Sequence, residues 1–372
     1  MRILFTRFPL ESRYGGAEVQ TMALLRGFAA RHHAVAFLGS CPTLLKLCWD
    51  EGILAAELKI GAPPVTKWSA LSFLWRKRRM QERLQSALRE FGRIDALIML
   101  SLSEKLLLTP FALERGIRVF WMEHDGIGRW LTKNPWLPGL KELARSVTTI
   151  TVSDLSRDLY CRLGWPEEHT VSIPNGVDTE RSGIGIGLEK GEREKESRDG
   201  LKLGTIARLT EDKGIDVLID AITDLPQVSL TVIGEGSEEG YLRKLVDERG
   251  LADRVQIIPD VDDLGAFYRS IDVFILPSRL HDPFGLVAAE AMMLGIPAII
   301  TNQCGIARHL VAGREALVVE ADSIAQLNSA IVEMEQRDRR LALAHAGTYA
   351  ARERFSLERM MDRYEKILKG SN

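Results

Sequence analysis

Residues 277–292 read PSRLHDPFGLVAAEAM, and this stretch decides how we interpret the fold. A short apolar run, Val273–Leu276, comes immediately before it, and the polar loop then leads through Gly285 into a second apolar segment. The first run has the length of a strand buried on both faces, and the second has the length of a helix. A strand, a loop and a helix in this order form the unit from which parallel sheets covered by helices are built.

The same alternation of short apolar runs and longer amphipathic segments extends over the rest of the chain. The predicted strands are 2–6, 34–38, 96–100, 118–122, 149–152 and 171–173, then 202–206, 229–233, 255–258, 273–276, 298–300 and 316–319. The predicted helices are 17–31, 71–91 and 154–162, then 214–221, 238–249, 263–270, 285–294 and 324–336. We expect an α/β protein with two doubly wound, Rossmann-like domains that face each other across a cleft.

The composition changes between these two series. Residues 181–200 (RSGIGIGLEKGEREKESRDG) mix glycines with a dense run of charges and have no apolar period, which is typical of a flexible linker. We therefore expect an N-terminal domain at 1–180 and a C-terminal domain at 201–351. A last helix is expected at 352–369, where apolar residues recur at helical spacing.

The overall composition is that of a soluble globular protein, with 45% hydrophobic and 27% charged residues. Net charge is -2, but residues 1–180 carry 24 lysines and arginines against 19 aspartates and glutamates. This excess suggests an anionic partner for the first half but is too mild to indicate nucleic acid. The four cysteines form no metal-binding or disulfide pattern, and no apolar stretch is long enough to span a membrane. We expect a cytoplasmic protein that is at most peripheral on the inner face of a membrane.

Three loops at strand ends carry residues suited to phosphate chemistry. Gly15 and Gly16 open a predicted helix, where bare backbone and unpaired amides can approach a pyrophosphate, although a plain tight turn has the same pattern. Arg208 and Lys213 lie five residues apart after a strand and can both reach one diphosphate, the alternative being two solvated surface charges. Two such cations would neutralise a leaving nucleotide without a metal.

The loop at 277–292 adds two carboxylates to this chemistry. Asp282 precedes the predicted helix, and the amides near Phe284, Gly285 and Leu286 are expected to be unpaired helix-start donors. Glu290 lies inside an otherwise apolar helix, where a carboxylate needs a partner. Ribose hydroxyls of a ligand would provide one, and a structural salt bridge is the alternative.

These segments (GGAE at 15–18, PNGVD at 174–178, ARLTEDKG at 207–214 and PFGLVAAEAM at 283–292) together resemble the retaining family 4, or group 1, glycosyltransferases of the GT-B fold. The resemblance covers nearly the whole chain. It implies that Gly16 approaches the donor and that Arg208 and Lys213 bind its diphosphate. It also implies that Glu290 holds the ribose hydroxyls and that the last helix crosses back to the first domain. The donor-binding residues that follow from it are Gly15, Gly16, Pro259, Asp260, Val261, Phe284, Gly285, Leu286, Val287 and Glu290.

Asp282 is a departure from that family, because it stands where the family's Glu-x7-Glu signature has its first glutamate. In the family this residue contacts hydroxyls of the transferred sugar. An aspartate places the carboxylate roughly 1 Å further back, near the displacement at which catalytic geometry starts to matter. The shorter side chain predicts either a changed sugar contact or a loss of activity.

Two residues of the first half are further candidates. The resemblance places His124 near the transferred sugar, and a satisfied loop histidine is the alternative. Glu18 is a weak candidate for the acceptor side, since it also simply favours a helix N-terminus. Asp260-Val261-Asp262 spells a motif that binds metal in glycosyltransferases of another fold, but here it is expected to begin a surface helix. We predict no metal site and no cofactor.

The resemblance implies transfer of a hexose-type sugar with retention, from a nucleotide-diphosphate sugar to a glycan or lipid-linked acceptor. Residues 67–80 combine tryptophans with a basic run, which predicts either peripheral membrane contact or a helix that buries Trp68, Leu71, Leu74 and Trp75 in the core. The alternatives in function are a sugar phosphorylase, a nucleotide-sugar epimerase and a catalytically impaired nucleotide-sugar-binding protein. The sequence does not identify the sugar, the base or the acceptor.

Overall fold

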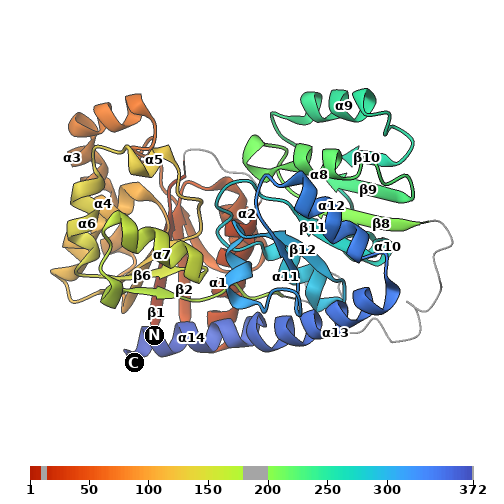
Figure 1. Cartoon of the computed structure of the whole chain (residues 1–372). Coiled ribbons are helices and arrows are strands. Elements are labelled where there is room, and N and C mark those ends of the chain that lie inside the picture. Colours follow the sequence, from red (N-terminus) through yellow and green to blue (C-terminus); the bar gives the residue numbers. More distant parts are fainter. Residues whose placement is uncertain (10–14, 179–199, 371–372) are drawn as a thin grey trace. The chain divides into compact units, whose positions relative to one another are not determined.

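The computed structural model describes residues 1–9, 15–178 and 200–370, which divide into two compact units (Figure 1). Unit 1 comprises Met1–Gly176 and Met360–Asn372, and unit 2 comprises Val177–Arg359. Each unit contains one parallel sheet with helices, so the α/β prediction is confirmed. The predicted linker at 181–200 lies outside the described residues except for Gly200.

Unit 1 is built on a seven-stranded parallel sheet in the order β3-β2-β1-β4-β5-β6-β7. Its strands are β1 (Arg2–Arg7), β2 (Ala34–Gly39), β3 (Leu54–Glu57), β4 (Ala96–Met99), β5 (Arg118–Glu123), β6 (Thr148–Thr151) and β7 (Thr170–Ser172). Its helices are α1 (Gly16–Ala30), α2 (Pro42–Asp50), α3 (Lys67–Glu90), α4 (Leu102–Leu113), α5 (Arg129–Thr132), α6 (Leu137–Ala144), α7 (Asp154–Leu163) and the short η1 (Glu167–His169).

Unit 2 is built on a six-stranded parallel sheet in the order β10-β9-β8-β11-β12-β13. Its strands are β8 (Leu201–Ile206), β9 (Val228–Ile233), β10 (Val255–Ile258), β11 (Val273–Leu276), β12 (Ala298–Thr301) and β13 (Leu317–Val319). Its helices are η2 (Glu211–Lys213), α8 (Ile215–Ala221), α9 (Glu239–Glu248), α10 (Leu264–Ser270), α11 (Leu286–Met293), η3 (Gly305–His309), α12 (Ile324–Glu333) and α13 (Arg337–Arg354), and α14 (Leu357–Lys369) follows them.

The strand order reverses once in each sheet, between β1 and β4 in unit 1 and between β8 and β11 in unit 2. At such a point the two neighbouring strands send their connections to opposite sides, which leaves a crevice at their carboxyl ends where ligands bind in open α/β sheets. The apolar runs of β4 and β11 are buried at every residue, as expected for central parallel strands.

All twelve predicted strands are present, with ends that differ by at most one residue. Strand β3 was not predicted, because this edge strand (LAAE) contains no continuous apolar run and is partly exposed. The helices α2, α4, α5, α6 and α13 were not predicted either. Ser153 caps α7, which begins at the predicted residue, because its hydroxyl accepts a hydrogen bond from the Ser156 amide at 3.1 Å.

The predicted last helix at 352–369 is wrong at its start. Residues up to Arg354 belong to α13, and α14 begins at Leu357 after a break at the buried Phe355. The carbonyl of Phe355 accepts a hydrogen bond from the Val177 amide, which ties the break to the chain that leaves unit 1.

Helix α14 returns to unit 1, as the family resemblance implies. Tyr364 packs edge-on against Phe28 of α1, and Glu365 lies 3.1 Å from the ring of His33. A Cβ atom on Gly27 would come within 2.5 Å of the Met361 sulfur, so the two helices touch where α1 has no side chain.

Helix α3 begins at Lys67, four residues before the predicted start, because Thr66 and Ser69 form a reciprocal capping box. Its buried side chains are Ser69, Ala70, Phe73, Met80, Leu84 and Leu88. The interpretation that Trp68, Leu71, Leu74 and Trp75 enter the core is wrong, since all four are exposed. In the described residues, none of the helices combines the length and apolar character needed to cross a bilayer.

Candidate active site

The predicted diphosphate-binding residues lie at the reversal point of the unit 2 sheet. Arg208 and Lys213 follow β8, and Asp282 lies in the loop after the neighbouring strand β11. This position is the carboxyl-end crevice in which open α/β sheets bind their ligands.

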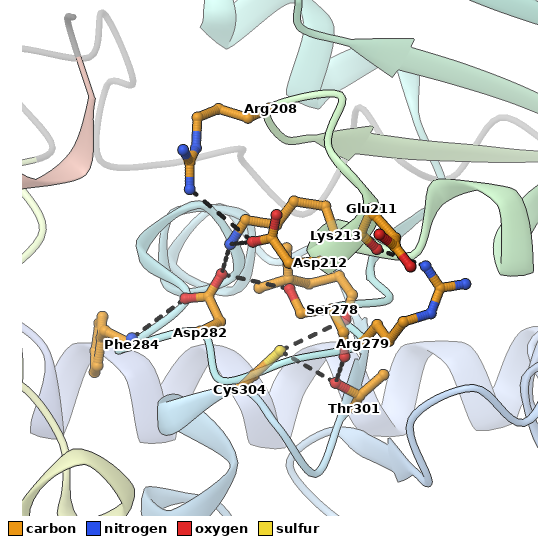
Figure 2. Close-up of polar contacts among 11 residues, drawn as sticks. Arg208, Glu211, Asp212, Lys213, Ser278, Arg279, Asp282, Phe284, Thr301 and Cys304 are labelled. Atoms are coloured by element: carbon orange, nitrogen blue, oxygen red, sulfur yellow. Dashed lines mark hydrogen bonds and ion pairs between the residues drawn. The ribbon is translucent and has the colours of Figure 1, made fainter. Parts of the chain in front are cut away.

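A buried ion pair joins the two loops. The ammonium of Lys213 lies 2.6 Å from the Oδ2 atom of Asp282, and the two side chains are 12% and 13% exposed (Figure 2). Burial raises the pKa of the Asp282 carboxyl, but the ammonium of Lys213 and the amide of Phe284 outweigh it, so its pKa lies below the usual value. Burial lowers the pKa of Lys213, yet Asp282 raises it above its usual value. Both groups are therefore charged at neutral pH.

Arg208 lies near the Lys213–Asp282 pair, and its side chain is largely exposed (Figure 2). Its guanidinium is 4.0 Å from the Oδ2 atom of Asp212, and the ammonium of Lys213 is 3.9 Å from that same atom. The two cations are consequently separated by less than about 8 Å, a distance that one diphosphate bridges. The structure thus brings together Arg208, Lys213 and Asp282, and Asp212 is a fourth member that the sequence analysis did not select.

Arg279 fixes the backbone of this loop. Its guanidinium donates to the carbonyl oxygen of Glu211 at 2.5 Å and pairs with Asp216 at 2.7 Å and with Asp322. The carbonyl oxygen of Asp212 accepts from the Arg279 amide at 2.8 Å. The η2 turn that carries Lys213 is therefore attached to the loop after β11 by both side-chain and backbone bonds.

Gly214 makes the close approach of these two loops possible. Its φ angle of +64° lies in the left-handed region, and an added Cβ atom would come within 2.3 Å of the carbonyl oxygen of Pro277. Only glycine combines this backbone conformation with the necessary space.

The start of α11 differs from the prediction in one respect. The helix begins at Leu286, and the amide of Phe284 is not an unpaired donor, because it donates to the Oδ1 atom of Asp282 at 3.3 Å. Gly285 precedes the helix with a φ angle of +91°. Leu286 and Val287 then form its first turn, at the end of the loop that carries Asp282.

Glu290 has a structural partner, but not the salt bridge considered from the sequence. Its Oε2 atom accepts a hydrogen bond from the Tyr268 hydroxyl of α10 at 3.0 Å, and it makes no ion pair within the described part of the chain. Burial raises the pKa of Glu290 to about 7, against the lowering effect of the Tyr268 hydrogen bond. The sequence could not identify Tyr268, which lies 22 residues away on a different helix.

The loop after β10 carries three of the predicted donor-binding residues. Pro259 and Asp260 are exposed, Val261 is half-buried, and the Val261 amide bonds to the Asp260 side chain. Asp263, not Asp260 or Asp262, caps α10 by accepting from the Ala266 amide at 2.8 Å. Across the described residues no group of three or more histidine, cysteine or acidic side chains is arranged to hold a metal.

A pocket of about 560 Å³ adjoins Arg279 on unit 2. Its polar lining includes Glu211, Asp216, Glu238 and Asp322, so acidic groups dominate it. Such a lining disfavours a diphosphate, and Lys213, Asp282 and Glu290 are not among its lining residues. We therefore place the candidate donor site at the Lys213–Asp282 pair and not in this pocket.

In unit 1 the predicted glycines lie at the start of α1, after β1. A Cβ atom built on Gly16 meets no described atom within 4 Å, whereas one on Gly15 meets the Glu18 carboxylate at 3.5 Å. Glu18 itself is buried and paired with Arg7 at 2.7 Å. Glu18 therefore lies in the first turn of α1, as expected, and also forms a buried ion pair that was not predicted.

His124 follows β5 in the same unit. Its Nε2 atom is buried without a hydrogen-bond partner in the part of the chain that the structure describes, so it is not a satisfied loop histidine. Burial, together with the charges of Arg7 and Lys105, lowers the pKa of His124 to about 3. The imidazole is neutral at physiological pH.

The residue before His124 is held by a buried network that was also missed. Glu123 accepts from the ammonium of Lys105 at 2.8 Å and from the Tyr160 hydroxyl at 2.9 Å, and all three are buried. In the sequence, the only indication of this network is that the apolar strand β5 ends in a charged residue, Glu123. The contacts fix the main chain from which His124 projects.

Comparisons with known proteins identify the fold and the family of this chain. The family model "Glycosyltransferase Family 4" matches residues 14–181, and the model "Glycosyl transferases group 1" matches residues 189–354. The HepE protein of Anabaena, solved with UDP and glucose, superposes with a TM-score of 0.81 at 19% identity over 100% of both chains. WaaG, a glycosyltransferase involved in lipopolysaccharide biosynthesis, gives a TM-score of 0.71 at 18% identity over 99% of this chain and 100% of its own. The two units therefore have the GT-B fold.

Curated relatives are more similar in sequence over shorter segments. The lipopolysaccharide core biosynthesis glycosyltransferase LpsE of Rhizobium meliloti is 30% identical over 207 residues, which is 55% of this chain and 59% of LpsE. The O-antigen biosynthesis glycosyltransferase WclY of Escherichia coli is 40% identical over 104 residues, 28% of this chain and 29% of WclY. The matched segments thus span between 29% and 59% of the relatives' lengths. The chain belongs to the group 1, family 4 type of glycosyltransferases.

Proposed function

We propose that this protein transfers a hexose-type sugar from a nucleotide-diphosphate sugar to a glycan or lipid-linked acceptor, with retention of the anomeric configuration and without a metal ion. The observation that carries the proposal is the placement of Arg208 and Lys213 around one point at the reversal of the unit 2 sheet. Two cations at that point neutralise the charge that develops on a departing diphosphate.

In the proposed reaction the bond between the anomeric carbon and the β-phosphate oxygen breaks, and the acceptor oxygen bonds to the same face of the sugar. The acceptor proton passes to the departing phosphate oxygen. Lys213 exchanges part of its contact with Asp282 for the diphosphate, so the Asp282 carboxylate becomes available to a sugar hydroxyl. Glu290 accepts hydrogen bonds from the ribose. In unit 1, Gly16 offers bare backbone to the donor, and the neutral ring of His124 bonds to a sugar hydroxyl.

The names of the relatives support the choice of substrate class. LpsE and WclY are named for lipopolysaccharide core and O-antigen biosynthesis, and another relative, from Mycobacterium tuberculosis, is named as a GDP-mannose-dependent mannosyltransferase acting on a phosphatidylinositol monomannoside. We propose an acceptor of the same kind, a cell-envelope glycan or its lipid-linked precursor. Peripheral contact with the inner face of a membrane through residues 67–80 belongs to this proposal.

The test begins with a thermal-shift screen of UDP-, GDP- and ADP-sugars, because a ligand that binds the folded state raises the melting temperature. Hydrolysis of the donor found in this way is then measured with and without EDTA, and NMR of the released sugar gives its anomeric configuration. We expect turnover that EDTA does not affect. Binding without turnover, in both the native protein and Asp282→Glu, would instead support a nucleotide-sugar-binding protein.

A further inference from the structure

The first two turns of α3 carry an exposed apolar stripe. Trp68 and Trp75 are 78% and 76% exposed, and Leu71 between them is 51% exposed. These residues lie at positions i, i+3 and i+7, which places them on one side of the helix. The opposite side is buried and includes Ala70, Phe73 and Met80. Large apolar side chains gathered in this way on a soluble protein mark an interaction surface.

The stripe continues into a basic segment. Between residues 67 and 83 the helix carries six lysines and arginines and a single acidic residue, Glu82. Arg76 and Arg83 donate to backbone carbonyl oxygens, so they also hold the helix in place. Arg78 is exposed and pairs with Glu82 at 3.2 Å, and Arg79 is exposed one residue further along.

The exposed tryptophans and arginines of α3 indicate the kind of partner that this surface binds. Tryptophan side chains prefer the interface between water and hydrocarbon, and arginines beside them attract a negatively charged surface. A helix with one buried side packed on its own protein, exposed tryptophans on the other and basic flanks lies in the plane of a membrane surface.

We propose that the first half of α3, residues 67–79, docks on membranes containing anionic phospholipids, with Trp68, Leu71 and Trp75 inserted between the headgroups. The inference deepens the proposed membrane contact and rests on it. It does not depend on the transfer reaction, because all of its residues lie on α3 in unit 1 and the candidate donor residues of unit 2 are not involved.

Vesicle co-sedimentation of the purified full chain tests the proposal. Vesicles of phosphatidylcholine alone are compared with vesicles containing about one third phosphatidylglycerol, at low and high salt. We expect at least about tenfold tighter binding to the anionic vesicles, lost at high salt. Arg78→Glu with Arg79→Glu, and separately Trp68→Ser with Trp75→Ser, should each weaken the binding about tenfold or more, whereas Trp68→Phe with Trp75→Phe should retain most of it.

Matched controls come from exposed residues of unit 2. Tyr349→Ser removes an aromatic side chain that is 69% exposed on α13, and Lys244→Glu reverses an exposed charge on α9; neither should change vesicle binding. Nucleotide binding, followed by thermal shift, should persist in all variants and shows that they are folded. No binding of the native chain to either vesicle, or equal binding by the tryptophan variant, overturns the proposal. Self-association that the tryptophan variant abolishes, without vesicle binding, would assign the surface to a second copy of the chain.

Discussion

The ammonium of Lys213 lies 2.6 Å from the carboxylate of Asp282, although the two residues are 69 positions apart in the chain and follow different strands. The pair couples the residue proposed to bind the diphosphate to the residue proposed to contact the sugar. Residue 282, an aspartate where the family has a glutamate, therefore affects more than the proposed sugar contact. Its carboxylate also holds the ammonium of Lys213 in place and keeps it charged.

Removing the Asp282 charge should destabilise unit 2. Asp282→Asn leaves a buried ammonium with only the Asp212 carboxylate, 3.9 Å away, and breaking a buried pair in this way typically costs about 3–5 kcal/mol. Urea denaturation at pH 7 measures the loss. The double change Lys213→Met with Asp282→Asn should recover part of it, because no charge then remains unpaired.

The same pair predicts a dependence on pH. Because the folded-state pKa of Asp282 lies below its ordinary 3.8, the stabilisation is complete above that value and is lost as the pH falls through the folded-state pKa. The stability difference between the native protein and Asp282→Asn should therefore shrink only in acid. A constant difference from pH 7 down to pH 2 would contradict the assignment.

The sequence was sufficient to predict twelve of the thirteen strands in the described residues and to place the candidate site residues in the loops that follow strands. Strands such as β11 are continuous apolar runs, which parallel sheets buried on both faces require, and the loops after them hold the polar residues. The edge strand β3 lacked that signal because it is short and partly exposed. Helix α3 was located, but its exposed side was not, since the same apolar spacing suits a core or a docking surface.

Side-chain contacts between residues on different elements could not be predicted from the sequence. Tyr268 bonds to Glu290 because α10 and α11 flank β11, and Lys105 meets Glu123 because β4 and β5 are neighbours in the sheet. Pairing of this kind depends on strand order, which a single sequence specifies only through the whole fold. The prediction that Glu290 needs a partner was right in its physics, and the identity of that partner required coordinates.

The open space at Gly16 leads to a prediction that separates folding from binding. Gly16→Ala adds a methyl group that meets no described atom within 4 Å, and alanine in a helix is favoured over glycine by about 0.5–1 kcal/mol. Stability should therefore be unchanged or slightly higher, while donor binding falls at least about tenfold because the methyl group occupies the space proposed for the donor.

Gly240→Ala is the matched control for that variant. Gly240 also lies in the first turn of a helix, α9, and a Cβ atom there likewise meets no described atom within 4 Å. Calorimetric titration with the best nucleotide sugar compares the two proteins. Equal donor affinity for Gly16→Ala and Gly240→Ala would remove Gly16 from the donor site.

Glu290 should make donor binding depend on pH. Its pKa of about 7 means that the carboxylate form, the stronger acceptor for ribose hydroxyls, becomes dominant as the pH rises through 7. Affinity should increase across this range and become insensitive to pH in Glu290→Gln. Tyr268→Phe removes the hydrogen bond that lowers the pKa of Glu290, so the midpoint of the binding curve should move to higher pH. A midpoint that moves to lower pH, or stays fixed, would show that the Tyr268 hydrogen bond does not lower the pKa of Glu290.

The buried Lys105–Glu123 pair should stabilise unit 1 and position His124. Lys105→Met leaves the Glu123 carboxylate with only the Tyr160 hydroxyl, and the expected loss of stability is about 3–5 kcal/mol. Lys105→Met with Glu123→Gln should be less destabilised than Lys105→Met alone, because the buried negative charge is gone. Thermal denaturation of the three proteins at pH 7 gives the comparison, and a double variant no more stable than Lys105→Met would contradict the buried-charge explanation.

His124 should act as a neutral hydrogen-bonding group and not as a titrating acid. Its pKa of about 3 keeps the ring uncharged from pH 5 to pH 8, and the orphaned Nε2 atom is then the group that a sugar hydroxyl would satisfy. The NMR signals of the His124 ring should not shift over this range. His124→Asn should lower kcat about tenfold, the effect of one lost hydrogen bond, without removing an ionisation from the pH–rate profile. A His124 titration centred near pH 6.5 would show instead that the ring is solvated and available as an acid, and the proposed sugar contact would then have to be abandoned.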